Sequence, residues 1–177
     1  MIHSLDFDDT HARASLHTSA PIVPAALAAA EMAGVDGSEW TWGSLFLDVD
    51  LDGFEDLLVA NGHGRDMRDG DALQRVTDLR GSVTWDQAKS LYPDLPTRNR
   101  AFRNRGDLPF EEVGDEWGFS QGPDVSHGIA TGDLDGDGDL DIAVANGHIL
   151  DDVSRMKDNV TFPQPNQVLV NRLTELN

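Results

Sequence analysis

Two short segments of the chain carry aspartates at spacings that suit a metal ion. They read Asp48-x-Asp50-x-Asp52-Gly53-x-x-Asp56 and Asp133-x-Asp135-x-Asp137-Gly138-x-x-Asp141. The four carboxylates at these shared positions repel one another, so each segment calls for a compensating positive charge. Calcium accepts about 6–8 oxygen ligands at about 2.3–2.6 Å in a tolerant geometry, and alternate side chains of a tightly curled loop converge on one point. The spacing therefore predicts two Ca2+ sites, one in each loop.

The two loops predict equivalent ligand sets. Positions 1, 3, 5 and 9 supply carboxylates, and position 7 supplies its backbone carbonyl oxygen. Glycine at position 6 permits a sharp turn that a Cβ would obstruct. The predicted ligands are Asp48, Asp50, Asp52, Phe54 and Asp56 in the first loop, and Asp133, Asp135, Asp137, Asp139 and Asp141 in the second.

Other interpretations of the loops fit less well. An EF-hand opens with the same spacing but needs a glutamate at position 12 and a helix on each side. Position 12 is Val59 in the first loop and Val144 in the second, each inside an apolar segment, so the EF-hand interpretation fails. An Asp/Gly turn with solvated carboxylates is the plain alternative, although two loops of the same spacing favour a metal. Magnesium prefers to keep several waters, and an all-oxygen set disfavours zinc.

The loops lie inside an internal repeat. Trp42–His63 and His127–His148 align without a gap, and eleven of the 22 positions are identical. Each copy predicts one strand before the loop and one after it, the second ending in an Asn-Gly turn. A third strand follows each copy, and a fourth follows the first copy, as is typical of propeller blades. The expected strands are Ser44–Leu47, Leu57–Ala60, Arg98–Asn104 and Phe110–Val113, then Gly128–Thr131, Ile142–Ala145 and Gln167–Asn171.

This pattern predicts an all-β fold, a partial β-propeller of about two blades with short helical insertions. Residues 1–38 form an N-terminal segment with a short helix at Pro24–Ala33, and residues 1–19 show no clear period. Residues 39–120 form the first blade, with a long insertion at 64–96. One short helix is expected there, because Thr84-Trp85-Asp86-Gln87 fits a capping box. Residues 121–177 form a second blade that lacks its fourth strand.

The composition narrows the range of partners. The formal net charge is −19, from 13 Lys+Arg and 32 Asp+Glu, which argues against nucleic acid and against an anionic membrane surface. Without cysteine there is no disulfide framework or thiolate metal site. No apolar run approaches the ~20 residues that cross a bilayer, so no membrane insertion is expected. The apolar segment Ala20–Ala30 lacks the basic flank of a signal peptide. Cations are therefore the natural partners.

Three stretches, Trp40–His63, Asn99–Phe119 and Ser126–His148, resemble the FG-GAP/VCBS repeat that is also found in integrin α-subunit heads. Within that group they are most similar to proteins related to cartilage acidic protein, which often carry an ASPIC/UnbV module. The resemblance implies a ring of about seven blades, with calcium bound by hairpin loops through the eight spaced aspartates. It also implies an exported protein, extracellular, periplasmic or at the cell surface, that serves adhesion or recognition. The chain departs from the group in having no ASPIC/UnbV module and only a weak FG-GAP signature.

Three further motifs have a functional and a plain interpretation. His63 and His148 each follow Asn-Gly at the end of a strand, where a ligand-facing histidine and a locally packed one are both open, with local packing favoured. Arg105-Gly106-Asp107 matches an adhesion tripeptide but is typical of a hairpin turn. Asn159-Val160-Thr161 is a glycosylation sequon, relevant only in a secreted eukaryotic protein.

The sequence carries no G-x-S-x-G elbow, phosphate loop or dinucleotide fingerprint, so no catalytic residue is predicted. The expected function is a calcium-stabilised, non-enzymatic recognition module for a protein or glycan ligand. The alternative is a fragment of a calcium-dependent propeller enzyme, a polysaccharide lyase or hydrolase, whose catalytic residues lie outside this chain. Two blades leave sheet edges unpaired, so further blades or self-association are expected to complete the structure.

Overall fold

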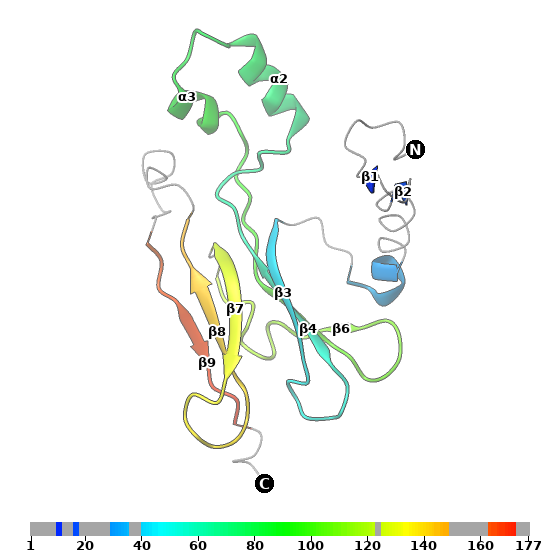
Figure 1. Ribbon diagram of the computed structural model, residues 1–177. Coiled ribbons are helices and arrows are strands. Elements are labelled where there is room, and N and C mark those ends of the chain that lie inside the picture. Colours follow the sequence, from blue (N-terminus) through cyan, green and yellow to red (C-terminus); the bar gives the residue numbers. More distant parts are fainter. Residues whose placement is uncertain are drawn as a thin grey trace.

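Antiparallel β-sheets position the aspartate loops in the computed structural model of this chain (Figure 1). The structure describes residues 10–11, 16–17, 29–35, 40–122, 125–148 and 163–172. The first sheet has the order β3 (Thr41–Leu47), β4 (Asp56–Asn61), β5 (Arg100–Arg103) and β6 (Glu111–Glu112). The second has the order β7 (Ser126–Gly132), β8 (Asp141–Asn146) and β9 (Gln167–Leu169). The described residues are thus mostly β-sheet with few helices, as an all-β fold requires.

The sequence repeat is a structural repeat. Ser44 pairs with Val59 in the first hairpin, and Ile129 pairs with Val144 in the second, at the same register. Each first strand also has a register shift near its start, between Thr41 and Gly43 and between Ser126 and Gly128. The seven strands expected from the sequence all form, with ends that differ by a few residues.

The two sheets bury their apolar side chains against each other. Leu58 and Ala101 from the first sheet meet Ile142 and Val144 from the second, together with Phe119 from the turn after β6. Leu58 is fully buried, and Phe119 is 1% exposed. Truncating such a residue to alanine costs roughly 2–5 kcal/mol. Because this core holds the hairpins side by side, both aspartate loops lie at the same end of the sheets (Figure 1).

The insertion between β4 and β5 folds into two helices at the opposite end of the sheets (Figure 1). Helix α3 (Trp85–Ser90) confirms the capping box: Gln87 N donates to Thr84 Oγ1 over 3.3 Å, and Thr84 N donates to Gln87 Oε1 over 2.8 Å. The expectation of a single helix was wrong, because α2 (Gly70–Asp78) precedes α3. The dipeptide Asp69-Gly70 suggests a turn. In the structure the Asp69 carboxylate instead caps the helix by accepting from Ala72 N over 2.6 Å.

The N-terminal segment contains a short helix, at residues 29–33. It ends at Gly34, whose φ of 70° suits glycine, and Val35 N donates to Ala30 O over 3.0 Å. The remainder of the predicted helix, 24–28, lies outside the described residues. The strands β1 (Thr10–His11) and β2 (Leu16–His17) pair with each other, within the stretch whose sequence shows no clear period.

No helix among the described residues has the length and apolar character needed to span a bilayer.

Candidate metal centres

The first loop is curled by hydrogen bonds from its own backbone to its aspartates. Asp48 accepts from Asp52 N and Gly53 N, each over 3.0 Å, and Asp52 Oδ1 accepts from Phe54 N over 2.9 Å. Gly53 has a φ of 94°, which only glycine adopts without strain. The result is that one carboxylate oxygen each of Asp48, Asp50 and Asp52 lies within 4.8 Å of the others.

The second loop is also curled by hydrogen bonds from its own backbone to its aspartates. Asp133 Oδ1 accepts from Gly136 N over 2.7 Å, and Asp137 Oδ1 accepts from Asp139 N over 2.9 Å. Gly138 has a φ of 98°, matching the glycine of the first loop. Here the carboxylates that lie within 4.8 Å of one another are those of Asp133, Asp135 and Asp141. Each loop therefore gathers three of its four predicted carboxylates, leaving out Asp56 in the first and Asp137 in the second.

The aspartate at position 9 fastens each loop to its sheet. Asp56 is fully buried and accepts from Val49 N over 2.9 Å and from Asn104 N, just after β5, over 2.8 Å. Asp141 is also fully buried and accepts from the equivalent loop amide, Leu134 N, and from Asn171 N after β9. Burial raises the pKa of Asp56, against the lowering effect of these two amides. Position 9 therefore has a structural role in addition to its predicted role as ligand.

Both loops contain a buried carboxylate oxygen that the protein leaves unsatisfied. Asp50 Oδ1 and Asp137 Oδ2 have no hydrogen-bond partner among the described residues. Burying an anionic oxygen without a partner is costly, so it needs a cation or a donor. The pKa of Asp135 is also raised, by desolvation and by the neighbouring Asp137 and Asp141. A bound Ca2+ would supply the missing charge and the missing ligand partner, so these donor sets fit calcium.

Position 7 differs between the loops. The Phe54 ring lies against Gly106, where an added Cβ would come within 2.6 Å of the ring. This contact links the first loop to the β5–β6 turn, in which Arg105-Gly106-Asp107 lies, and Gly106 has the positive φ of a turn glycine, 80°. Asp139, the equivalent residue of the second loop, is 4% exposed. The predicted role of position 7, a backbone carbonyl ligand, stays a prediction.

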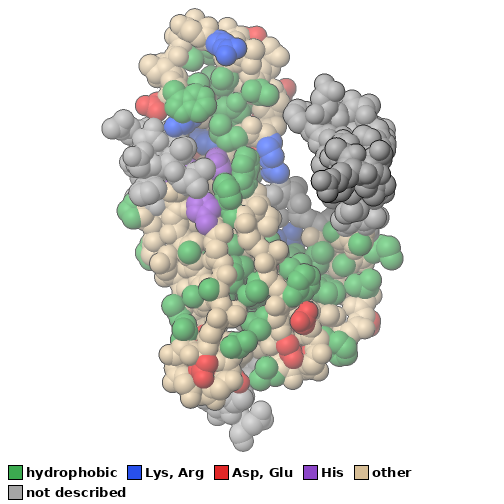
Figure 2. Space-filling model, viewed as in Figure 1, with side chains coloured by type: hydrophobic (Ala, Val, Ile, Leu, Met, Phe, Trp, Pro, Cys, Tyr) green, Lys and Arg blue, Asp and Glu red, His purple; other side chains and the backbone are tan. Residues whose placement is uncertain are grey.

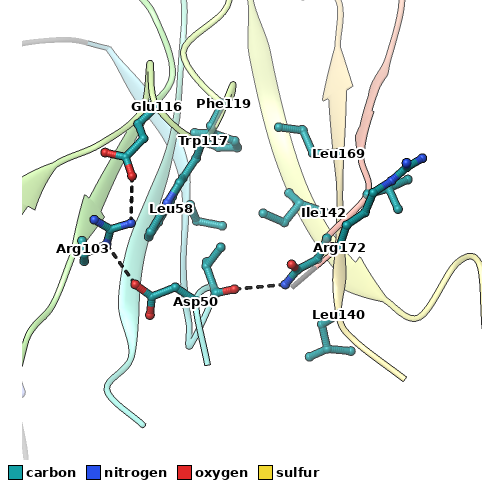
Figure 3. Close-up of a pocket in the computed structure, with 13 residues that line it drawn as sticks. Asp50, Leu58, Arg103, Glu116, Trp117, Phe119, Leu140, Ile142, Leu169 and Arg172 are labelled. Carbon is teal, nitrogen blue, oxygen red and sulfur yellow. Dashed lines mark hydrogen bonds and ion pairs between the residues drawn. The ribbon is translucent and has the colours of Figure 1, made fainter. Parts of the chain in front are cut away.

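An arginine distinguishes the first loop from the second. Arg103 Nε lies 2.9 Å from Asp50 Oδ2, and Arg103 Nη2 lies 3.1 Å from Glu116 Oε1. Figure 3 shows Arg103 between these two carboxylates. The equivalent position after β9 is Val170, because Asn104 and Asn171 make the same hydrogen bond. Among the described residues, no lysine or arginine forms an ion pair with Asp135, the counterpart of Asp50. Sequence analysis missed Arg103, since only the pairing of the third strands reveals this equivalence.

A cavity of about 350 Å³ lies between the two sheets next to the first loop (Figure 3). Its walls combine apolar side chains such as Leu58 and Ile142 with the charged Asp50, Arg103 and Arg172. Asn171 Nδ2 donates to Val49 O over 3.0 Å, which ties the second sheet to the first loop beside this cavity. The first loop thus contacts the sheet interface directly.

The two predicted histidines come together at the end of the sheets away from the loops. His63 and His148 are 8% and 4% exposed, and their ring centroids lie 5.5 Å apart. Trp40 stacks on His63 at 4.5 Å. Burial lowers the pKa of His63, and burial together with the charge of His63 lowers that of His127. His127 was missed by the sequence analysis, because it occupies the position of Trp42 in the repeat.

Comparison with known protein families supports the assignment of a repeat in this chain. Residues 90–144 match the FG-GAP-like repeat model, and the match contains the whole second loop and most of its hairpin. This supports an FG-GAP repeat in a β-rich chain, although it covers less than half of the residues. Residues 1–68 match the MmgE/PrpD N-terminal domain, a range that includes the first loop. Nothing in the geometry of the described residues accounts for that second match. A search of curated proteins finds no match.

Proposed function

We propose that this chain is a calcium-binding FG-GAP-type module that serves recognition and has no catalytic role of its own. The observation that carries the proposal is the unsatisfied, buried carboxylate oxygen in each loop, Asp50 Oδ1 and Asp137 Oδ2. Structurally equivalent loops that each gather three carboxylates support it. The ligands are the predicted ones, with position 9 serving both the ion and the fold.

Calcium in this proposal stabilises the ends of the two hairpins. Each loop connects the first two strands of its sheet, and its position 9 carboxylate also contacts the residue after the third strand. Neutralising the loop charges would therefore hold three strands of each sheet in register. In this proposal the ion is a structural element of the two sheets.

The wider setting follows from the resemblance to the FG-GAP/VCBS group. We propose that the two sheets are two blades of a propeller of about seven blades, exported to the cell surface, periplasm or extracellular space. In that setting the module binds a protein or glycan ligand. The integrin-like and ASPIC/UnbV-associated members of the group, which the sequence resembles, serve as models for this role.

A calcium titration tests the proposal. After removal of bound metal with EDTA, isothermal titration is expected to show two Ca2+ sites and little response to Mg2+. Calcium at ~100 times its dissociation constant would stabilise the folded state by about 2.7 kcal/mol per site, visible as a higher Tm. A chain that gives no heat with calcium, and whose Tm is unchanged by millimolar calcium, would refute the proposal.

A further inference from the structure

Three histidines gather at the end of the sheets opposite the acidic loops. His63 follows β4 and His148 follows β8, each after the same Asn-Gly pair. The repeat therefore places both histidines at the same end of their hairpins. Their ring centroids lie 5.5 Å apart. Figure 2 shows histidine side chains together on the visible face, near the helical insertion.

The third histidine comes from the register shift at the start of β7. His127 stands between Ser126 and Gly128, where the pairing with β8 is interrupted, and Trp42 occupies the same place in β3. Such irregularities re-aim a side chain, and here Trp42 and His127 meet edge to face at 4.7 Å. His127 Nε2 is buried and has no hydrogen-bond partner among the described residues.

One tautomer of His63 suits a metal ligand. Its Nδ1 lies 2.7 Å from Arg65 O and 3.2 Å from Arg65 N, and a proton on Nδ1 makes the shorter contact a hydrogen bond to the carbonyl. The lone pair is then on Nε2. Metal-binding histidines are commonly oriented in this way, with one ring nitrogen donating to a backbone carbonyl and the other free for the ion. The stacking of Trp40 on the ring also holds its orientation.

The spacing of the rings suits a shared ion. Two imidazoles that bind one tetrahedral ion at about 2.0–2.1 Å place their ring centroids about 5 Å apart. The separation of His63 and His148 is 5.5 Å. The ligand atoms of the three histidines do not all lie within 4.8 Å of one another, so side-chain rotation has to complete the set.

We propose that His63, His127 and His148 bind a divalent transition-metal ion of the zinc class, at a site separate from the acidic loops. Imidazole nitrogens suit such ions, whereas calcium requires oxygen ligands. Local packing explains the Trp40–His63 stack, but it leaves the buried His127 Nε2 without a partner. A metal ion bound by His127 would give that nitrogen a partner. The inference does not depend on calcium binding by the loops.

The test uses the intact chain with saturating Ca2+, so that the acidic loops do not compete for the added ion. Titration with Co2+ is expected to give one saturable set of visible absorption bands that Zn2+ abolishes. His63→Gln and His148→Gln are each expected to weaken binding at least about tenfold, and His127→Gln is expected to weaken it too. The matched control replaces the other three histidines, His3, His11 and His17, with glutamine and is expected to retain binding.

A measurement on the unaltered chain keeps the test valid if a variant misfolds. Histidine side-chain NMR resonances of three residues are expected to shift on addition of Zn2+, and the variants assign them to positions 63, 127 and 148. Absence of saturable Co2+ and Zn2+ binding overturns the proposal. So does binding that the control abolishes, or binding that survives in folded His63→Gln and His148→Gln chains.

Discussion

Replacing Arg103 should strengthen calcium binding by the first loop. Arg103 Nε lies 2.9 Å from Asp50 Oδ2, while Asp50 Oδ1 is buried without a partner. Asp50 can therefore hold the arginine with one oxygen and a calcium ion with the other. The arginine then sits as a resident positive charge beside the ion. The second loop has Val170 at the position of Arg103, so the two loops of one chain compare a site with an arginine to a site without one.

The size of the effect follows from the geometry. An ion bound to the far oxygen of Asp50 would lie about 6 Å from the guanidinium, given calcium–oxygen distances of about 2.4 Å. At that separation, a unit charge and a divalent ion repel by about 1–3 kcal/mol at an effective dielectric constant of about 40–80. Since about 1.4 kcal/mol corresponds to a tenfold change in affinity, Arg103→Gln should tighten the first site about tenfold. The glutamine side-chain amide can occupy the position of Arg103 Nε, and the substitution removes the charge.

The assay isolates one loop at a time. Calcium titrations of Arg103→Gln are made in an Asp135→Ala background, which disables the second loop, and are compared with Asp135→Ala alone. The reciprocal change, Val170→Arg, is made in an Asp50→Ala background. It is expected to weaken the second site, because it places an arginine beside that loop.

The opposite outcome would refute this reasoning. If Arg103→Gln weakened or abolished calcium binding while the chain stayed folded, Arg103 would be needed to orient Asp50. An unchanged affinity would show that the arginine moves away when the ion binds, for example wholly to Glu116, from which it is 3.1 Å distant.

Three further predictions concern the loops and the first sheet. Asp50→Ala and Asp135→Ala should each remove one calcium site and leave the other nearly intact, as counted by isothermal titration, because the loops belong to different sheets. Asp56→Ala should lower the free energy of unfolding by about 2–5 kcal/mol even in EDTA, since it leaves two backbone amides without an acceptor, and chemical denaturation measures this. Arg100 lowers the pKa of Glu112 by hydrogen bonding, so this pair stabilises the fold above the ordinary pKa of 4.5, and the contribution is lost as the pH falls through the lowered value. Glu112→Gln should therefore reduce stability slightly at neutral pH and flatten its acid dependence, as measured by thermal melts across the pH range.

Matching side-chain hydrogen bonds recur at one end of each of the two sheets. The side-chain hydroxyls of Thr41 and Ser126 each donate to an asparagine, Asn61 and Asn146, over 2.7 Å. The backbone N–H groups of the same asparagines donate to the side-chain Oδ1 atoms of Asn99 and Asn166, just before the third strands, over 3.0 and 2.9 Å. These bonds satisfy polar groups at one end of each sheet, and the position 9 aspartate does so at the other. The two copies of the repeat therefore share these polar residues because each sheet needs them to satisfy its own hydrogen bonds.

The sequence by itself determined the hairpins and the loops, because both depend on local rules. Alternating side chains and an Asn-Gly turn define strands within a few residues, and aspartates at alternate positions converge once the loop curls. The spacing does not show that Asp50 and Asp137 each have a buried oxygen without a hydrogen-bond partner among the described residues, which depends on the folded surroundings. The capping box of α3 was equally readable, since all its partners lie within one turn.

Only the tertiary structure decided which distant residues accompany these loops. Arg103 reaches Asp50 because β5 pairs with β4 across the long insertion, and no local pattern specifies that register. His63 and His148 meet because the apolar core holds the two hairpins side by side. Such contacts depend on how buried surfaces pack, which is a property of the whole chain. The loop chemistry is therefore local, whereas its charge balance and the histidine cluster are set by packing.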